Sequence, residues 1–252
     1  MVSKYFGSTT PYTGSNVIKL VFDRSLIPWN IPFPSYNPPE YTAEKAKKQP
    51  WSDDKELSTY KFNEIDGNIN RVSHMGHYLL SEENGAPLNP QGRTGIKGRG
   101  ILGRYGPNMA ADPIVSRFNH GKLQFVAIKR QDTKEWAIPG GMVDAGENVS
   151  QTLKREFSEE AMDGMDPNIL HEIWAHPKIL YKGYVDDPRN TDNAWMETVV
   201  ANFHDHHGLL QNFKFTAGSD AAEVKWFTVE DGYDNLYASH RDFIKLLENE
   251  FK

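Results

Sequence analysis

Apolar and polar positions follow a regular period mainly in the second half of the chain. Residues Ile114–Phe118 and Leu123–Lys129 have the pattern of strands, and Asn119 to Lys122 between them suit a hairpin turn. Further strand-like runs cover Trp136–Ile138, Lys178–Val185, Trp195–Phe203 and Glu223–Val229. A β-rich second half is therefore predicted, beginning near Pro113.

Two segments of the second half have a helical pattern. The first is predicted over Val149–Met162, with Asn148 as N-cap and Gln151 able to bond back to it. The second is predicted over Ser239–Phe251, where apolar residues recur at helical spacing. Strands mixed with a few helices indicate an α+β or α/β fold, in which helices cover a sheet.

The first half has a different character. Residues 1–60 are rich in Pro and aromatic residues and lack a sustained period, which predicts an extended arm laid over other surfaces. The tract Gly85–Pro113 is dense in Gly and Pro, and we interpret it as the approach to a second domain. The predicted domains are an N-terminal domain with its arm over residues 1–112 and a second domain over residues 113–252.

Composition narrows the possible chemistry of this 252-residue chain. Cysteine is absent, which excludes disulfides, thiolate metal sites and a cysteine nucleophile. The net charge of −6 disfavours a nucleic-acid partner, and an anionic substrate would need a cation. No apolar run is long enough to insert into a membrane, and no export or transit pattern is visible, so we expect a cytoplasmic location, with the mitochondrion as the alternative.

Acidic residues are concentrated on the predicted helix Val149–Met162. Glu156, Glu159 and Glu160 stand at positions i, i+3 and i+4, so their side chains converge on one face. Two carboxylates about 4 Å apart repel by roughly 4 kcal/mol at an effective dielectric of about 20. A divalent cation would reverse that repulsion, and oxygen donors without His or Cys suit Mg²⁺, for which Mn²⁺ can substitute. A solvated, charge-laced helix is the alternative interpretation.

The residues around these acids resemble the Nudix box. The pattern is filled by Gly141, Glu147, Arg155, Glu156, Phe157, Glu159 and Glu160. Glycines at the turn Pro139-Gly140-Gly141 let the backbone approach a metal or phosphate closely. The family pattern continues with a glycine where this chain has Met162, and Gly164 stands nearby to end the helix.

Three further stretches narrow the resemblance. Ile179–Trp195, Gly92–Pro107 and Leu236–His240 are similar to the mitochondrial ADP-ribose pyrophosphatases. They are also similar to the homologous C-terminal domain of ADP-ribose-gated melastatin-type cation channels. The similarity extends over nearly the whole chain. Unlike the vertebrate channel domains, this sequence keeps the glutamates of the box.

The resemblance implies both a fold and a site. The fold is an N-terminal domain followed by a Nudix α/β/α sandwich with a mixed sheet, and ADP-ribose binds in the cleft between them. Glu156, Glu159 and Glu160 are the implied metal ligands and catalytic acids, and Arg155 orients them. The implied substrate contacts are Asp187, Arg189, Tyr237, Ser239, His240, Ile138 and Gly141.

The implied activity is Mg²⁺-dependent hydrolysis of ADP-ribose to AMP and ribose 5-phosphate. One alternative is a sensor module that binds ADP-ribose and gates a tetrameric channel to which it is covalently joined, with little or no turnover. Another is a different Nudix substrate, such as NADH or a dinucleoside polyphosphate, since the box by itself recognises a diphosphate and a metal. The attacked phosphorus, the number of metals, the general base and the oligomeric state stay open.

Overall fold

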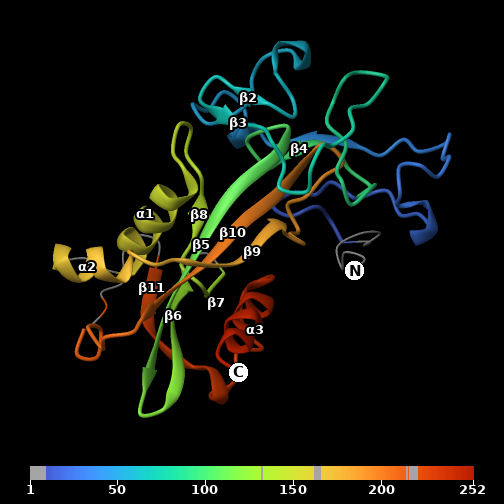
Figure 1. Ribbon diagram of the computed structural model, residues 1–252. Helices are drawn as coiled ribbons and strands as arrows, with labels where there is room; N and C mark the ends of the chain where they lie inside the picture. The colour runs from blue at the N-terminus through green and yellow to red at the C-terminus, as the bar shows by residue number, and fades with distance from the viewer. Residues whose placement is uncertain (1–9, 132, 162–165, 214, 216–220) are drawn as a thin grey trace. The chain divides into compact units, whose positions relative to one another are not determined.

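The computed structural model describes residues 10–131, 133–161, 166–213, 215 and 221–252 (Figure 1). Within these ranges, the side chains of Glu159, Glu160, Ala161, Pro167, Leu170 and Ala221 are not described. The chain forms two compact units. The N-terminal unit contains Met1–Met109, Asp144–Gly146 and Gly183–Glu197, and the C-terminal unit contains Ala110–Val143, Glu147–Lys182 and Thr198–Lys252. Two segments from the second half of the sequence therefore belong to the N-terminal unit.

The main sheet has seven strands. Its order is β11 (Ala221–Thr228), β6 (Lys122–Arg130), β5 (Gly106–Asn119), β10 (Ala194–Asp205) and β9 (Lys178–Tyr184), while β7 (Trp136–Ala137) pairs with β6 and β8 (Gly141–Met142) pairs with β5. The predicted hairpin joins β5 to β6, with Asn119 opposite Lys122. His120 and Gly121 both have positive φ, 49° and 76°, as a two-residue hairpin turn requires.

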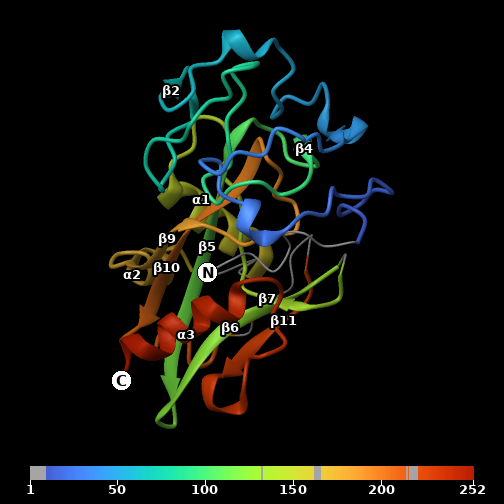
Figure 2. The ribbon, with the colours of Figure 1, turned by 90° about the vertical axis from the view of Figure 1, so that its right-hand side faces the viewer.

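In the C-terminal unit the sheet buries side chains on both faces, because neighbouring residues of a strand point to opposite sides. Helices α1 (Val149–Ala161) and α2 (Pro167–Ile173) pack on one face, over a core that includes Val115, Val126, Leu153, Phe157 and Ala201. Helix α3 (His240–Glu250) packs on the other, over a core that includes Ile114, Phe125, Ala127, Val200, Ile244 and Leu247. Figures 1 and 2 show these layers, which confirm the predicted sandwich.

The ends of the helices follow local signals. The Gln151 amide donates to the Asn148 side chain at 3.0 Å and the Asn148 amide to the Gln151 side chain at 2.8 Å, so the predicted cap of α1 is confirmed. The predicted end at Met162 lies outside the described residues. Helix α2 was not predicted, although Pro167 at its first position is a recognised start signal. No helix of the described residues is long and apolar enough to cross a membrane.

The N-terminal unit has little regular structure. It contains the parallel pair β1 (Glu40–Thr42) and β4 (Lys97–Gly100), the small hairpin β2 (Ile65–Asp66) and β3 (Ile69–Asn70), and the short 3₁₀ turns η1 (Arg24–Leu26), η2 (Glu44–Ala46) and η3 (Leu57–Thr59). The Arg93 guanidinium lies 4.8 Å from the Trp29 ring and 5.2 Å from the Tyr36 ring, and it donates to the carbonyls of Leu26 and Pro28. One buried cation thus anchors the described part of the aromatic arm.

Asp192 is expected to make the stability of the N-terminal unit depend on pH. It is 3% exposed and accepts hydrogen bonds from the Tyr36 hydroxyl and from the amide and hydroxyl of Thr94. Burial raises the pKa of Asp192 to about 6. The folded chain therefore keeps a proton there between pH 4 and 6 that the unfolded chain releases, so this group makes the fold less stable as the pH rises.

Between pH 5 and pH 8 this group is expected to lower the free energy of unfolding by roughly 1 to 2 kcal/mol. Asp192→Asn removes the titration. The free energy of unfolding of the variant, relative to that of the wild type, should therefore be higher at pH 8 than at pH 5 by that amount. Urea unfolding at both pH values measures it. An unchanged difference would mean that Asp192 has an ordinary pKa.

Candidate functional site

The glycine turn lies next to the acidic helix α1. Strand β7 leads through Ile138 into Pro139-Gly140-Gly141, and Gly141 pairs with Ala111 of β5. A Cβ on Gly141 would overlap the carboxylate of Glu156, which comes from α1 and is only 8% exposed. The absence of a side chain at Gly141 therefore makes room for that acid.

Arg155 holds two acids of the site in place. Its Nε and Nη2 donate to both carboxylate oxygens of Glu147 at 3.0 and 2.9 Å, and its Nη1 lies 2.8 Å from Oε1 of Glu156. Nη2 also donates to the carbonyl of Met142 at 3.1 Å, and the Thr152 hydroxyl donates to Glu147 at 2.7 Å. The hydrogen bonds to Glu147, together with the two negative charges, raise the pKa of Arg155 above its ordinary value. Arg155 thus links the carboxylates of Glu147 and Glu156.

Of the three predicted metal ligands, only Glu156 has a described side chain. The side chains of Glu159 and Glu160 lie outside the described part, although their backbone belongs to α1. Among the described residues, no three His, Asp or Glu side chains are grouped as metal ligands. The donor that is present, a buried carboxylate packed against a glycine, is a hard oxygen ligand and fits a divalent cation.

Asp112 supports the turn and was missed at the sequence level. It lies on β5, is 8% exposed and accepts a hydrogen bond of 2.5 Å from the Thr198 hydroxyl of β10. A Cβ on Gly140 would overlap its Oδ1, so the turn packs directly on this carboxylate. The sequence carried one signal, an acid within the otherwise apolar run Met109 to Val115.

The Tyr237–His240 motif reaches the same turn. Nδ1 of His240 accepts a hydrogen bond of 2.9 Å from the amide of Ile138, so the neutral ring carries its proton on Nε2. The Tyr237 amide donates to the carbonyl of Trp136 at 2.8 Å, and the Tyr237 ring lies 4.7 Å from the Arg130 guanidinium. Three of the predicted contact residues, Ile138, Tyr237 and His240, are therefore brought together. Ser239 precedes the first residue of α3.

Asp187 and Arg189 bind each other in the N-terminal unit. Both carboxylate oxygens of Asp187 accept from the Arg189 guanidinium at 2.7 Å, and one also accepts from the Arg189 amide at 2.8 Å. Asp187 is 3% exposed, while 30% of the Arg189 side chain is exposed. These three hydrogen bonds hold Arg189 against the buried carboxylate of Asp187.

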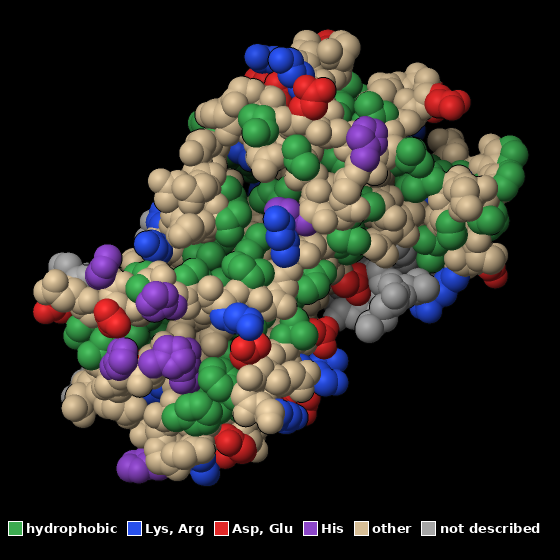
Figure 3. Space-filling model, viewed as in Figure 1, with side chains coloured by type: hydrophobic (Ala, Val, Ile, Leu, Met, Phe, Trp, Pro, Cys, Tyr) green, Lys and Arg blue, Asp and Glu red, His purple; other side chains and the backbone are tan. Residues whose placement is uncertain are grey.

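Histidines in the C-terminal unit gather over α2 and the end of β10 (Figure 3). The ring centroids of His204 and His206 lie 4.7 Å apart, and His207 is 3.5 Å from Glu172 of α2. Burial, with the neighbouring His206, lowers the pKa of His204 to about 4. The His204 ring is therefore neutral near pH 7, and it packs against the Ser116 hydroxyl, with Nδ1 of the ring 2.8 Å from that oxygen.

Both parts of the chain match known domain families. Residues 23–106 match the NUDT9-like N-terminal domain and residues 108–247 match the NUDIX domain. The chain is 47% identical to the mitochondrial ADP-ribose pyrophosphatase of Rattus norvegicus, over 95% of this chain and 76% of the relative. It is 44% identical to the transient receptor potential cation channel subfamily M member-like 2 of Nematostella vectensis, over 94% of this chain. That alignment covers only 17% of the channel.

Two solved structures are similar to part of the chain at lower sequence identity. The NUDIX domain of Shewanella oneidensis NrtR, crystallised with ADP ribose, is 17% identical, with a TM-score of 0.46 over 58% of this chain and 90% of that chain. A MutT/nudix family protein from Enterococcus faecalis is 22% identical, also with a TM-score of 0.46, over 57% of this chain and 61% of that chain. With its sandwich, its arginine-held acids and its two matched domains, the chain belongs to the Nudix hydrolase family and carries the NUDT9-like N-terminal domain.

Proposed function

We propose that this chain hydrolyses ADP-ribose to AMP and ribose 5-phosphate with Mg²⁺ as its cofactor. The observation that carries the proposal is the set of contacts around Arg155, which fixes Glu147 and Glu156 beside a glycine turn. The relation to the rat pyrophosphatase, at 47% identity over 95% of the chain, supports ADP-ribose as the substrate.

Each part of the site has a proposed task. Glu156, with Glu159 and Glu160, holds the divalent cation, and Arg155 keeps Glu156 in the orientation to do so. A divalent cation bound by these acids would supply positive charge to offset the negative charge of the diphosphate and would make a bound water molecule more acidic. Glu160, or an acid from a neighbouring loop, accepts the proton of the attacking water.

The substrate contacts are proposals of the same kind. Arg189, held by Asp187, offers its exposed side to a phosphate, since a guanidinium can donate two parallel hydrogen bonds. Tyr237 offers an aromatic face and a hydroxyl, and the backbone of Ile138 and Gly141 can approach the ligand closely. His240 and Ser239 complete the set next to Ile138, where Nδ1 of His240 is already engaged.

The direct test is to incubate the purified chain with ADP-ribose, with and without Mg²⁺, and to separate the products by chromatography. AMP and ribose 5-phosphate are expected only when the metal is present. NADH and a dinucleoside polyphosphate serve as competing substrates. If either one is cleaved faster than ADP-ribose, that compound is the preferred substrate, and the chain is still a hydrolase.

Gly141→Ala is expected to lower kcat by about a hundredfold, because the new Cβ displaces the Glu156 carboxylate by roughly an ångström. The backbone at Gly141 does not have the left-handed φ that alanine avoids, so the fold should persist. Steady-state kinetics measure the rate, and thermal unfolding checks the fold. A folded variant with the wild-type kcat would show that Glu156 can move without consequence.

A second function is favoured by the relation to the channel of Nematostella vectensis. In this alternative the chain is a module that binds ADP-ribose and biases the conformation of a tetrameric channel to which it is joined. Calorimetry distinguishes the two. ADP-ribose that binds and stays intact in Mg²⁺ supports the sensor, whereas rapid turnover supports the hydrolase.

A further inference from the structure

A cavity within the N-terminal unit is lined by an excess of basic side chains. Its volume is about 930 Å³, which falls in the range of small-molecule sites. It lies between the segment from Glu40 to Lys55 and the residues Arg99 and Tyr105. We propose that this cavity is an anion site that takes a small molecule bearing a di- or triphosphate group, separate from the proposed catalytic site.

Arg99 is the central observation. It is only 4% exposed, and it forms no ion pair with any described acidic residue. Its Nη1 donates to the carbonyls of Ala46 and Gly103, while its Nε is buried without a hydrogen-bond partner. A buried cation without a carboxylate carries a large desolvation penalty, which an arriving anion would offset.

The acids of the cavity do not cancel its basic charge. Asp53 is already bound by the Arg71 guanidinium at 2.8 and 2.9 Å, and Glu44 pairs with Lys47 at 2.6 Å. The remaining charged lining consists of four cations, Lys45, Lys48, Lys55 and Arg99, and two acids, Glu40 and Asp54. A local positive excess therefore exists in a chain whose net charge is −6.

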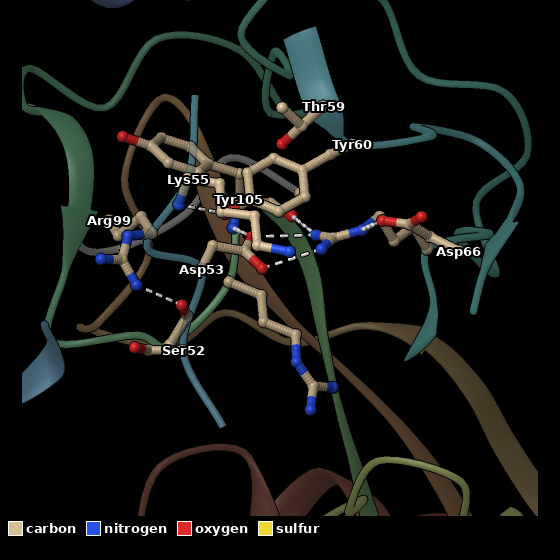
Figure 4. Close-up of polar contacts among 12 residues, drawn as sticks. Ser52, Asp53, Lys55, Thr59, Tyr60, Asp66, Arg99 and Tyr105 are labelled. Carbon is tan, nitrogen blue, oxygen red and sulfur yellow. Dashed lines mark hydrogen bonds and ion pairs between the residues drawn. The ribbon is translucent and has the colours of Figure 1, made fainter. Parts of the chain in front are cut away.

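The walls of the cavity are held by hydrogen bonds. The Ala43 amide donates to the carbonyl of Gly100 at 2.7 Å, and the Asp53 amide donates to that of Gly103 at 2.9 Å. Figure 4 shows Asp53 between Arg99 and Tyr105 on one side and Asp66 on the other. The guanidinium of Arg99 lies 5.5 Å from the Tyr105 ring. A rigid site with one buried arginine, exposed lysines at its edge and an aromatic ring suits a phosphate chain attached to a flat group.

Calorimetry on the full chain in EDTA tests the proposal, with inorganic pyrophosphate as the probe. Without a metal, the acids of the proposed catalytic site repel this anion, and a cavity variant separates binding in the cavity from binding at Arg189. The variant Lys45→Gln, Lys48→Gln, Lys55→Gln is expected to bind about tenfold more weakly, since each exposed charge contributes roughly a factor of two to three. These lysines are exposed, so the fold should persist.

The matched control carries Lys122→Gln, Lys134→Gln and Lys245→Gln, which removes the same charge from exposed positions outside the cavity. None of these three lysines lines the cavity, so this variant should bind pyrophosphate like the wild type. Equal losses in both variants, or no binding by the wild type, would overturn the proposal.

A parallel titration with ADP identifies the ligand. If the cavity variant weakens ADP as well as pyrophosphate, the site accepts a nucleotide, and if it weakens pyrophosphate alone, the site recognises the bare phosphate chain. Hydrolysis of ADP-ribose in Mg²⁺ should be unchanged in the cavity variant. A parallel loss of hydrolysis would place the pyrophosphate in the catalytic site and refute a separate one.

Discussion

Glu156→Gln is expected to slow the hydrolysis of ADP-ribose about a thousandfold in saturating Mg²⁺. The amide has the shape of the carboxylate but no charge, so it loses both the attraction for a divalent cation and the ion pair of 2.8 Å with Arg155. A cation at such a site contributes several kcal/mol of charge stabilisation, and each 1.4 kcal/mol is a factor of ten in rate. Product formation followed over time gives kcat.

Glu230→Gln is the matched control, because Glu230 is an exposed acid of the same unit, in the 3₁₀ turn that follows β11. It should leave kcat unchanged. The same assay on Glu159→Gln with Glu160→Gln tests the other two proposed ligands. Wild-type turnover in the Glu156 variant, with its thermal unfolding unaltered, would remove Glu156 from the site.

Arg71→Ala is expected to lower the free energy of unfolding by about 3 to 5 kcal/mol. Arg71 is 1% exposed, it forms a two-pronged pair with Asp53, and its Nε donates to Asp66 at 2.9 Å. Its guanidinium also lies 4.5 Å from the Tyr60 ring. Removing the arginine leaves Asp53 buried without its cation, and this uncompensated charge accounts for most of the loss. Urea unfolding followed by circular dichroism measures it.

Two companion variants separate charge from packing. Arg24→Ala removes an exposed arginine of η1 and should change stability by less than about 0.5 kcal/mol. Adding Asp53→Asn to Arg71→Ala should restore part of the loss, because the unpaired charge is then gone. If the double variant is as unstable as the single one, the lost packing of Arg71 explains the effect.

Local signals predicted the elements of the C-terminal unit well. The hairpin between β5 and β6, the capping box of α1 and the apolar stripe of α3 depend on residues a few positions apart, so the sequence displays them directly. β5 begins at Gly106, eight residues before the predicted strand, because pairing within the sheet extends it through glycine and proline. Helix α2, with only seven residues, was too short for its period to be recognised.

Contacts between distant polar residues were beyond prediction. Arg71 meets Asp53 across 18 positions of a segment without a regular period, and Asp192 meets Tyr36 across 156. The segments Asp144–Gly146 and Gly183–Glu197 belong to the N-terminal unit, although they stand among strands and helices of the other unit in sequence. The pattern of hydrophobic positions does not specify such partners, since polar side chains that bind each other are not separated by a fixed number of residues.

The sequence by itself determined the family and the candidate acids, because the box is a run of fixed offsets from Gly141 to Glu160 that a single turn and helix must present together. Only the tertiary structure decided how those residues are held. Arg155 bonds Glu147 and Glu156, Asp112 lies under Gly140, and His240 is fixed to Ile138. The physical reason is that hydrogen bonds and ion pairs depend on distances of about 3 Å between side chains. For residues far apart in sequence, only the folded backbone sets those distances.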